Sequence, residues 1–283
     1  MQKKDPRFIE MQISNLLDNP FFLKKFHLLE KALQRELDRY KDSLYYESLL
    51  YALKGGKRLR PILLLLCSET IREPFKEPYS AAIIVELIHT VSLVHDDMID
   101  KDLYRRGMES YHVKYGEEQA LLLADFVLSL VLELSMRYAE TEIPYLTSRT
   151  VRKMSEGQLL EVKLKSKEKI TWDEYFKIID GKTASLFELS SRAGAILSTE
   201  DPFLIKAISD YGRNLGITYQ LYDDLRDWPK KEYVQKLEVE NKEEFLKKKM
   251  EYYYNLACKA IDVLPKSGSK DLLLKFLEIT LKT

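Results

Sequence analysis

Cysteine is scarce in this chain of 283 residues, which contains only Cys67 and Cys258. The two lie far apart in the sequence, so their spacing excludes a cysteine-based metal site. We expect both to be buried free thiols, as is usual for proteins of a reducing cytosol. This pattern predicts a cytoplasmic protein.

An excess of charge of one sign and a long hydrophobic run are also missing. The chain has 45 basic and 45 acidic residues, so nothing global points to nucleic acid, and any anion site must be local. The longest clean apolar run, residues 62–67, is far too short to span a bilayer. The first residues lead into no secretory apolar region. We therefore expect neither a nucleic-acid partner nor a transmembrane segment.

Glycine and proline are few, at 10 and 9 residues, and they punctuate the chain rather than cluster. No hairpin dipeptide flanked by alternating strands stands out, and apolar residues recur at spacings of three and four, which is typical of helices. We predict an all-α chain, folded over residues 1–283 as a single-domain helical bundle with roughly ten or more helices. The expected breaks are at Gly55-Gly56, Glu73-Pro74, Gly107, Gly116, Ile143-Pro144, Gly181, Asp201-Pro202, Trp228-Pro229 and Leu264-Pro265.

Two copies of Asp-Asp-x-x-Asp are the most informative feature that is present. Each ends an apolar run, and the copies are Asp96-Asp97-Met98-Ile99-Asp100 and Asp223-Asp224-Leu225-Arg226-Asp227. Residues i and i+4 of a helix share one face, about 6 Å apart, so each copy presents a pair of carboxylates. Acidic residues on an apolar helix cost stability unless they are neutralised. If the helices face each other, the oxygens suit Mg²⁺, which bridges carboxylates to substrate phosphates.

Basic residues beside glycines form two candidate anion sites. The first is Gly55-Gly56-Lys57-Arg58-Leu59-Arg60-Pro61, in which Lys57 and Arg60 would lie beside a helix N-terminus that attracts anions. The second is Tyr104-Arg105-Arg106-Gly107, whose arginines could form simple ion pairs or grip a diphosphate bidentately. A solvated basic loop is the alternative for the first. His89, Lys182, Thr183 and Gln220 carry weaker signals, and a lone helical histidine such as His89 is more often structural than functional.

Taken together, these motifs resemble the trans-type (E)-polyprenyl diphosphate synthases, the family that makes farnesyl, geranylgeranyl and longer prenyl diphosphates. The resemblance covers about residues 45–228 in family order. Its further matches are Glu86-x-x-His89, Gly157-Gln158-x-x-Glu161, Lys182-Thr183-Ala184 and Tyr219-Gln220-x-x-Asp223-Asp224. It implies an isoprenoid synthase fold, a helical bundle around a central cavity. It also implies the Mg²⁺-dependent head-to-tail condensation of an allylic diphosphate with isopentenyl diphosphate, in which the allylic prenyl group is transferred and its diphosphate is released, with up to three ions when diphosphate is bound.

Site residues follow from the resemblance by motif. Asp96, Asp100 and Asp223 would hold the metals, supported by Asp97, Asp224 and Asp227. Arg105, Lys182 and Gln220 would contact the allylic diphosphate, and Thr183 would lie near the reacting carbon. The residues implied for binding isopentenyl diphosphate are Lys57, Arg60, His89 and Arg106.

Three departures from the family accompany these matches. The family usually has a flexible loop with a Gly-Lys element after the second motif, whereas here Trp228-Pro229-Lys230-Lys231 runs almost directly into a helix. The part after residue 228 looks shortened. The family's common Gly-Asp reads Ala124-Asp125. These departures bear on lid closure and turnover more than on metal binding.

Product length depends on the helix that ends at Asp100. Val91 lies five residues before Asp96, about 7–8 Å along the axis, where short-chain relatives often place aromatic residues. Because Val91 and Ser92 are small, we predict a tunnel that admits products of twenty or more carbons. In the alternative, Val91 packs in the core and the tunnel floor lies at Leu87, Ile88 or residues 121–128.

Other functions remain open from the sequence. They are a short-chain farnesyl diphosphate synthase, a catalytic or regulatory subunit of a heteromeric synthase, and a class I terpene cyclase. A cyclase would not need Lys57, Arg60 and Arg106 for a second diphosphate. The resemblance also implies a homodimer, formed through apolar helix faces such as residues 121–134.

Overall fold

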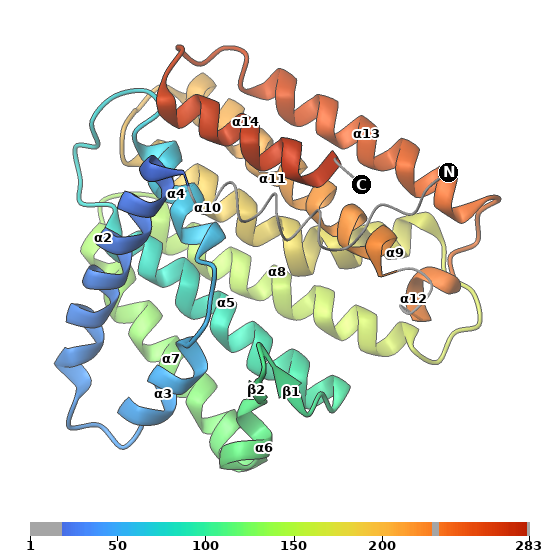
Figure 1. Ribbon diagram of the computed structural model, residues 1–283, viewed down its shortest axis with the longest axis horizontal. Coiled ribbons are helices and arrows are strands. Elements are labelled where there is room, and N and C mark those ends of the chain that lie inside the picture. The colour runs from blue at the N-terminus through green and yellow to red at the C-terminus, as the bar shows by residue number, and fades with distance from the viewer. Residues whose placement is uncertain (1–18, 228–231, 282–283) are drawn as a thin grey trace.

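The computed structural model describes residues 19–227 and 232–281. Helices dominate the part that it describes, as predicted, and the α-helices surround a central group of long ones (Figure 1). The helices are α2 (Pro20–Leu37), α3 (Tyr46–Leu53), α4 (Leu59–Ser68), α5 (Tyr79–Asp100), α6 (Tyr111–Tyr115), α7 (Glu117–Ser135), α8 (Ile143–Leu164), α9 (Trp172–Ile179), α10 (Ser185–Ile196), α11 (Pro202–Arg226), α12 (Glu232–Gln235), α13 (Lys242–Ala260) and α14 (Gly268–Leu281).

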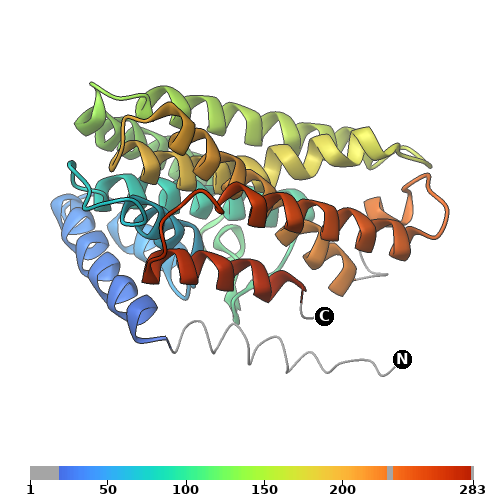
Figure 2. The ribbon, with the colours of Figure 1, turned by 90° about the horizontal axis from the view of Figure 1, so that it is seen from above.

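The long helices that carry the Asp motifs, α5 and α11, lie in the interior of the bundle. Helix α10 packs on both α11 and α4, and α5 packs on α4 and α7. Seen from above, α7 and α8 lie along one side of the molecule, and α13 and α14 lie along the other (Figure 2). The main core lies between these layers, where the side chains of residues 62–67 are almost completely buried. This arrangement confirms the predicted all-α class.

A short hairpin follows α5 and corrects the expectation that the chain has no hairpin. Strand β1 (Tyr104–Arg105) pairs antiparallel with β2 (Met108–Glu109). Arg106 and Gly107 form the turn, and both have positive φ angles, 54° and 75°. Two residues of positive φ are what a tight hairpin loop requires. Because each strand has only two residues, the sequence cannot display the alternation of apolar and polar residues that would indicate a strand.

Gly181 does not end a helix, although a break was predicted there. Instead, a π-helical turn (Asp180–Ala184) joins α9 to α10. A Cβ on Gly181 would lie 3.0 Å from the Cα of Gly157 in α8, and a Cβ on Gly157 would lie 3.0 Å from the backbone nitrogen of Lys182. The two glycines therefore allow α8 and the π-helical turn to cross with their backbones nearly in contact.

The segment after the second Asp motif is docked firmly where it is described. We call residues 232–239 the strap; it contains α12. Val234 and Leu237 are buried in a second apolar cluster formed with α9, α11 and α13. The backbone nitrogen of Ile170 donates to Lys236 O at 2.9 Å, and that of Glu238 donates to Ile170 O at 2.8 Å. The predicted departure at Trp228-Pro229-Lys230-Lys231 lies outside the described residues. The helix expected almost directly after it is divided into the short α12 and the long α13, which begins only at Lys242.

Candidate active site

The first Asp motif occupies the last turn of α5, which ends where Lys101 adopts a left-handed conformation. Asp96 lies 3.5 Å from Lys182 Nζ, and Asp100 accepts a hydrogen bond of 2.6 Å from Lys165 Nζ. Burial raises the pKa of Asp96 to about 6, against the opposing pull of Lys182 and with the support of the neighbouring Glu161 and Asp100 carboxylates. These two carboxylates share a face, as the i, i+4 spacing predicted.

Asp97 points in another direction. Its side chain is buried, and Arg105 Nε donates to Asp97 Oδ1 at 2.8 Å. Arg105 also contacts Asp102 at 3.4 Å. The first motif therefore divides into two carboxylates paired with lysines and one that anchors the hairpin.

The second motif divides in the same way. Arg226 forms ion pairs with Asp223 and, at 3.2 Å, with Asp227. Asp224, by contrast, is completely buried. It accepts hydrogen bonds from Tyr175 at 2.6 Å, from Tyr233 at 2.9 Å and from Gln220 Nε2 at 2.9 Å. Burial and the Asp224 charge hold the pKa of both tyrosines well above the ordinary value, so both hydroxyls stay protonated as donors.

The π-helical turn connects the two motifs. Lys182 pairs with Glu161 of α8 as well as with Asp96. The next residue, Thr183, donates its hydroxyl hydrogen to Gln220 Oε1 at 2.6 Å. An extra residue in a helical turn re-aims side chains, and such turns are frequent at functional sites. Here the turn directs two consecutive side chains toward different Asp motifs.

A cluster of cations lies beside these carboxylates. Arg60, in the first turn of α4, packs its guanidinium 4.5 Å from the centre of the Phe187 ring and donates to His89 Nε2 at 3.3 Å. Its buried Nε has no hydrogen-bond partner among the described residues. Burial and the nearby guanidinium groups of Arg60 and Arg106 hold the pKa of His89 well below its usual value, so the imidazole is neutral. The cluster is therefore prepared to accept an anion.

The loop that precedes α4 supports this cluster. Gly55 has a positive φ of 76° and lies against Arg106, where an added Cβ would be 3.5 Å from Arg106 Cδ. Lys57 is exposed on this loop. The neighbouring Arg58 is buried and bridges Glu30 at 2.7 Å and Glu86 at 2.6 Å. Arg58 thus fixes the loop to α2 and α5.

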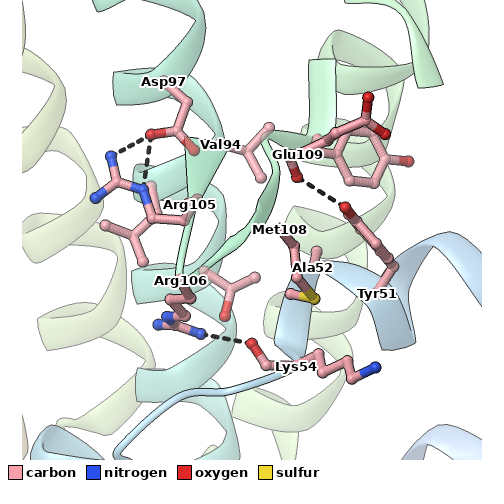
Figure 3. A pocket seen from close by; sticks show the side chains of 12 residues that line it. Tyr51, Ala52, Lys54, Val94, Asp97, Arg105, Arg106, Met108 and Glu109 are labelled. Carbon is pink, nitrogen blue, oxygen red and sulfur yellow. Dashed lines mark hydrogen bonds and ion pairs between the residues drawn. The ribbon is translucent and has the colours of Figure 1, made fainter. Parts of the chain in front are cut away.

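The two consecutive arginines of the hairpin diverge. Figure 3 shows Arg105 against Asp97, whereas Arg106 reaches the loop and donates to Lys54 O at 3.1 Å. Between them and α3 lies a cavity of about 30 Å³, which has room for about one water molecule. The cavity is too small for a prenyl group, so the tail of a substrate must go elsewhere.

A larger apolar cavity, of about 100 Å³, lies between α5, α7 and α8. A second cavity of about 80 Å³, lined by Asp96, Gln158 and Lys182, shares four lining residues with it. The shared residues are Ser92, His95, Met154 and Ser155. The two cavities thus adjoin each other, one beside Asp96 of the first Asp motif and the other in apolar surroundings. The apolar cavity is lined by Val91 and Ser92, the residues of the open-tunnel prediction, and also by Ile88, one candidate for the alternative tunnel floor. Both hypotheses for product length therefore concern the same space.

The structure gathers most of the sequence-predicted site residues into one region. Lys57 is exposed on the loop before α4, whereas Asp97 and Asp224 are buried with hydrogen-bond donors of their own. Residues that were not assigned a role also belong to the site: Glu161, Lys165, Arg226, Tyr175 and Tyr233. Helical spacing could have revealed Glu161, in the last turn of α8, and Lys165, the C-cap of that helix, which are spaced at i and i+4. Nothing in the sequence marks Tyr233.

Comparison with known proteins shows which family the chain resembles. The polyprenyl synthetase family model matches residues 42–259. A geranylgeranyl diphosphate synthase of Methanosarcina mazei is 36% identical over 191 residues, which is 66% of this chain and 59% of that protein. A geranylfarnesyl diphosphate synthase of the same organism is 37% identical over 174 residues, 62% of this chain and 58% of that one. The chain thus spans less than two thirds of the length of these relatives.

Solved structures extend the likeness over nearly the whole fold. A geranylgeranyl pyrophosphate synthetase from Geoglobus acetivorans has a TM-score of 0.82 at 25% identity and covers 92% of this chain and 99% of its own. The match to the family model includes both Asp motifs, the loop before α4 and the π-helical turn. The chain therefore belongs to the polyprenyl synthetase family.

Proposed function

We propose that this protein is a trans-polyprenyl diphosphate synthase that joins an allylic diphosphate to isopentenyl diphosphate. One observation carries the proposal: a cation cluster around Arg60 lies near Asp223 of the second Asp motif, and an apolar cavity adjoins the cavity that Asp96 of the first motif lines. Two anionic head groups and one apolar tail are the three features that such a reaction must accommodate. The matched relatives carry names of the same reaction class.

The chemistry of the side chains fits a divalent metal such as Mg²⁺. The donors are all carboxylate oxygens, which hard cations prefer. Within residues 19–227 and 232–281, no three carboxylate, imidazole or thiol groups converge as a ready-made metal site. Such an arrangement suits Mg²⁺, which usually uses one or two carboxylates together with substrate phosphates. Asp96, Asp100, Asp223 and Asp227 would hold up to three ions, which would supply stabilisation of the negative charge on the leaving diphosphate.

The residues of the chain have distinct tasks in this reaction. Lys182 and Arg105 would hold the allylic diphosphate, and fixed cations of this kind stabilise the charge that develops as the carbon–oxygen bond breaks. The oxygens of Thr183 and Gln220 would face the allylic cation without trapping it. Arg60, His89, Arg106 and Lys57 would bind the diphosphate of the second substrate, whose double bond attacks the cation. The released diphosphate then takes the proton, so no protein nucleophile is required.

The product is proposed to contain twenty or more carbons. The cavity beside Asp96 adjoins the cavity of about 100 Å³, and small side chains at Val91 and Ser92 leave it open. Two of the matched relatives are named for geranylgeranyl and geranylfarnesyl products.

We further propose that the protein is a cytoplasmic homodimer. Both cysteines are free, as expected, although Cys258 is half-buried rather than fully buried. Helix α7 exposes several leucines that a second copy would cover, with exposed fractions of 58% for Leu121 and 57% for Leu132.

The decisive test is a turnover assay. Purified protein is given Mg²⁺, isopentenyl diphosphate and allylic primers of five to twenty carbons, and the products are sized. We expect chain elongation, and we expect Asp96→Ala and Asp223→Ala each to reduce it by at least about a hundredfold. Asp210→Ala is the matched control, because Asp210 lies on the same helix, α11, and its carboxylate pairs with Lys206 one turn earlier. Release of a hydrocarbon from one allylic diphosphate alone would instead indicate a cyclase, and undiminished activity of both variants would reject the metal assignment.

A further inference from the structure

Asp224 is held by donors from three separate parts of the fold. Gln220 lies one turn earlier on α11, Tyr175 comes from α9, and Tyr233 comes from the strap. The carboxylate is completely buried, and hydrogen bonds to a charged group are each worth about 1.5–3 kcal/mol. Asp224 is therefore a fixed point to which α9, α11 and the strap are joined.

These bonds also fix the orientation of the Gln220 amide. Its Nε2 donates to Asp224 Oδ1 at 2.9 Å, so its Oε1 must point the other way, where it accepts the hydroxyl hydrogen of Thr183 at 2.6 Å. An amide flipped by 180° would place Oε1 against the carboxylate. Because the Thr183 hydrogen is committed to Gln220, the Thr183 oxygen keeps its lone pairs free for the reaction centre.

Tyr233 links this network to the strap. The strap is anchored at Ile170 by two backbone hydrogen bonds and by the buried Val234 and Leu237. Lys236 Nζ also donates to Lys165 O at 2.7 Å, and Lys165 itself holds Asp100 of the first motif at 2.6 Å. The same eight-residue segment thus contacts the supports of both Asp motifs.

We propose that Tyr233 is a positioning residue for prenyl transfer: through Asp224 it fixes the Gln220 amide and the Thr183 hydroxyl that face the allylic cation. This inference rests on the proposed function. Tyr175 acts on the same carboxylate from the opposite side. The strap, rather than the flexible Gly-Lys loop expected for the family, holds the second motif in its working geometry.

The test is a kinetic comparison of full-length Tyr233→Phe with the wild type. The variant keeps the half-buried ring and removes only the hydroxyl. We expect kcat to fall about tenfold, while KM for each diphosphate stays within about twofold, because the bond is predicted to act on the reacting centre and not on either head group. Tyr175→Phe should act in the same direction and serves as a second variant if the first folds poorly. Tyr252→Phe, on the exposed face of α13, is the matched control.

A double-mutant cycle separates positioning from simple stability. Tyr233→Phe should cost kcat much less in a Gln220→Ala background, since the group that it orients is then gone. A purely structural role would lower the melting temperature and leave kcat unchanged, and that result would overturn the inference alone. Additive losses in the cycle would overturn it as well. A wild-type protein that turns over no substrate pair would reject the proposed function, and the inference with it.

Discussion

Each carboxylate of the two Asp motifs has its own environment. Asp96, Asp100, Asp223 and Asp227 pair with lysine or arginine side chains. The second Asp of each motif, Asp97 or Asp224, is instead buried against cationic or neutral donors from elsewhere in the fold. A lysine or arginine side chain that pairs with a carboxylate can be replaced by a metal ion at modest cost in free energy, because the ion pair is partly exposed. A completely buried carboxylate with three donors cannot be released so easily. The aspartates of one motif are chemically identical but therefore have different roles.

The raised pKa of Asp96 predicts two opposite effects of pH. The folded protein holds this proton up to about pH 6, whereas the ordinary value is 3.8. Between these values the native state binds more protons than the unfolded chain, so the stability of the metal-free protein should decrease as pH rises from about 4 to about 6. Metal binding requires the ionised carboxylate, so it should weaken as pH falls through about 6.

The measurement is the rise in melting temperature that Mg²⁺ with inorganic pyrophosphate produces at each pH. This rise should be smaller at about pH 5 than at about pH 7. Asp210→Asn, which leaves the cleft untouched, should show the same pH profile as the wild type. A metal effect that is constant across this range would contradict the prediction.

At the scale of elements, the crossing of α8 with the π-helical turn holds Lys182 in place. Gly157→Ala would put a methyl group 3.0 Å from a backbone nitrogen, a contact that only a shift of the helices can relieve. We expect a loss of about 1–3 kcal/mol in the free energy of unfolding, as for other overpacked positions, together with reduced turnover. Chemical denaturation measures the first. Gly268→Ala is the control, because nothing lies within 4 Å of its added Cβ, and equal effects of the two changes would argue against the crossing.

The cavity between α5, α7 and α8 leads to a separate prediction about product length. Val91→Phe adds a ring to the cavity of about 100 Å³, so the product should shorten by at least one isoprene unit. Chromatographic sizing of the products checks this. Val113→Phe, on an exposed position of α6, should leave the distribution unchanged, and an unchanged distribution for Val91→Phe would remove that residue from the tunnel wall.

At the scale of the whole molecule, helix α7 has an apolar face that the described fold leaves uncovered. Leu121, Leu128 and Leu132 follow one face at helical spacing and are 58%, 44% and 57% exposed. The stretch Glu117–Tyr138 is long and apolar enough, by length and composition, to cross a membrane. Exposed apolar patches of this kind mark contact surfaces, and a symmetric dimer would cover the same face on both copies.

A double substitution tests the dimer. Leu121→Glu combined with Leu132→Glu should convert a dimer into monomers in sedimentation velocity experiments without detergent, because it would bury four charges at a two-fold contact. Leu44→Glu, at a completely exposed leucine, should leave the assembly unchanged. A wild-type protein that sediments as a monomer, or that needs detergent to stay in solution, would contradict the prediction.

Local sequence determined much of this protein. The spacing of apolar residues, with few glycines and prolines, predicted the helices, because amphipathic periodicity is a property of neighbours along the chain. Gly55, Gly116 and Asp201-Pro202 were correctly placed between helices or at their starts. The motifs also indicated the family, since each uses residues at fixed short spacings.

Tertiary structure decided the features that depend on contacts between residues far apart in the sequence. The hairpin at Arg106-Gly107 and the continuous helix through Gly181 depend on packing against the α3–α4 loop and against Gly157. The separation of Asp224 from Asp223 depends on Tyr175 and Tyr233, which lie 49 and 9 positions away from it in sequence. The sequence alone determined which residues could bind metal and diphosphate, because that is a matter of side-chain chemistry. Only the folded chain decided which of these residues pair with exposed cations and which are buried, because burial and long-range hydrogen bonds assign each carboxylate its partner.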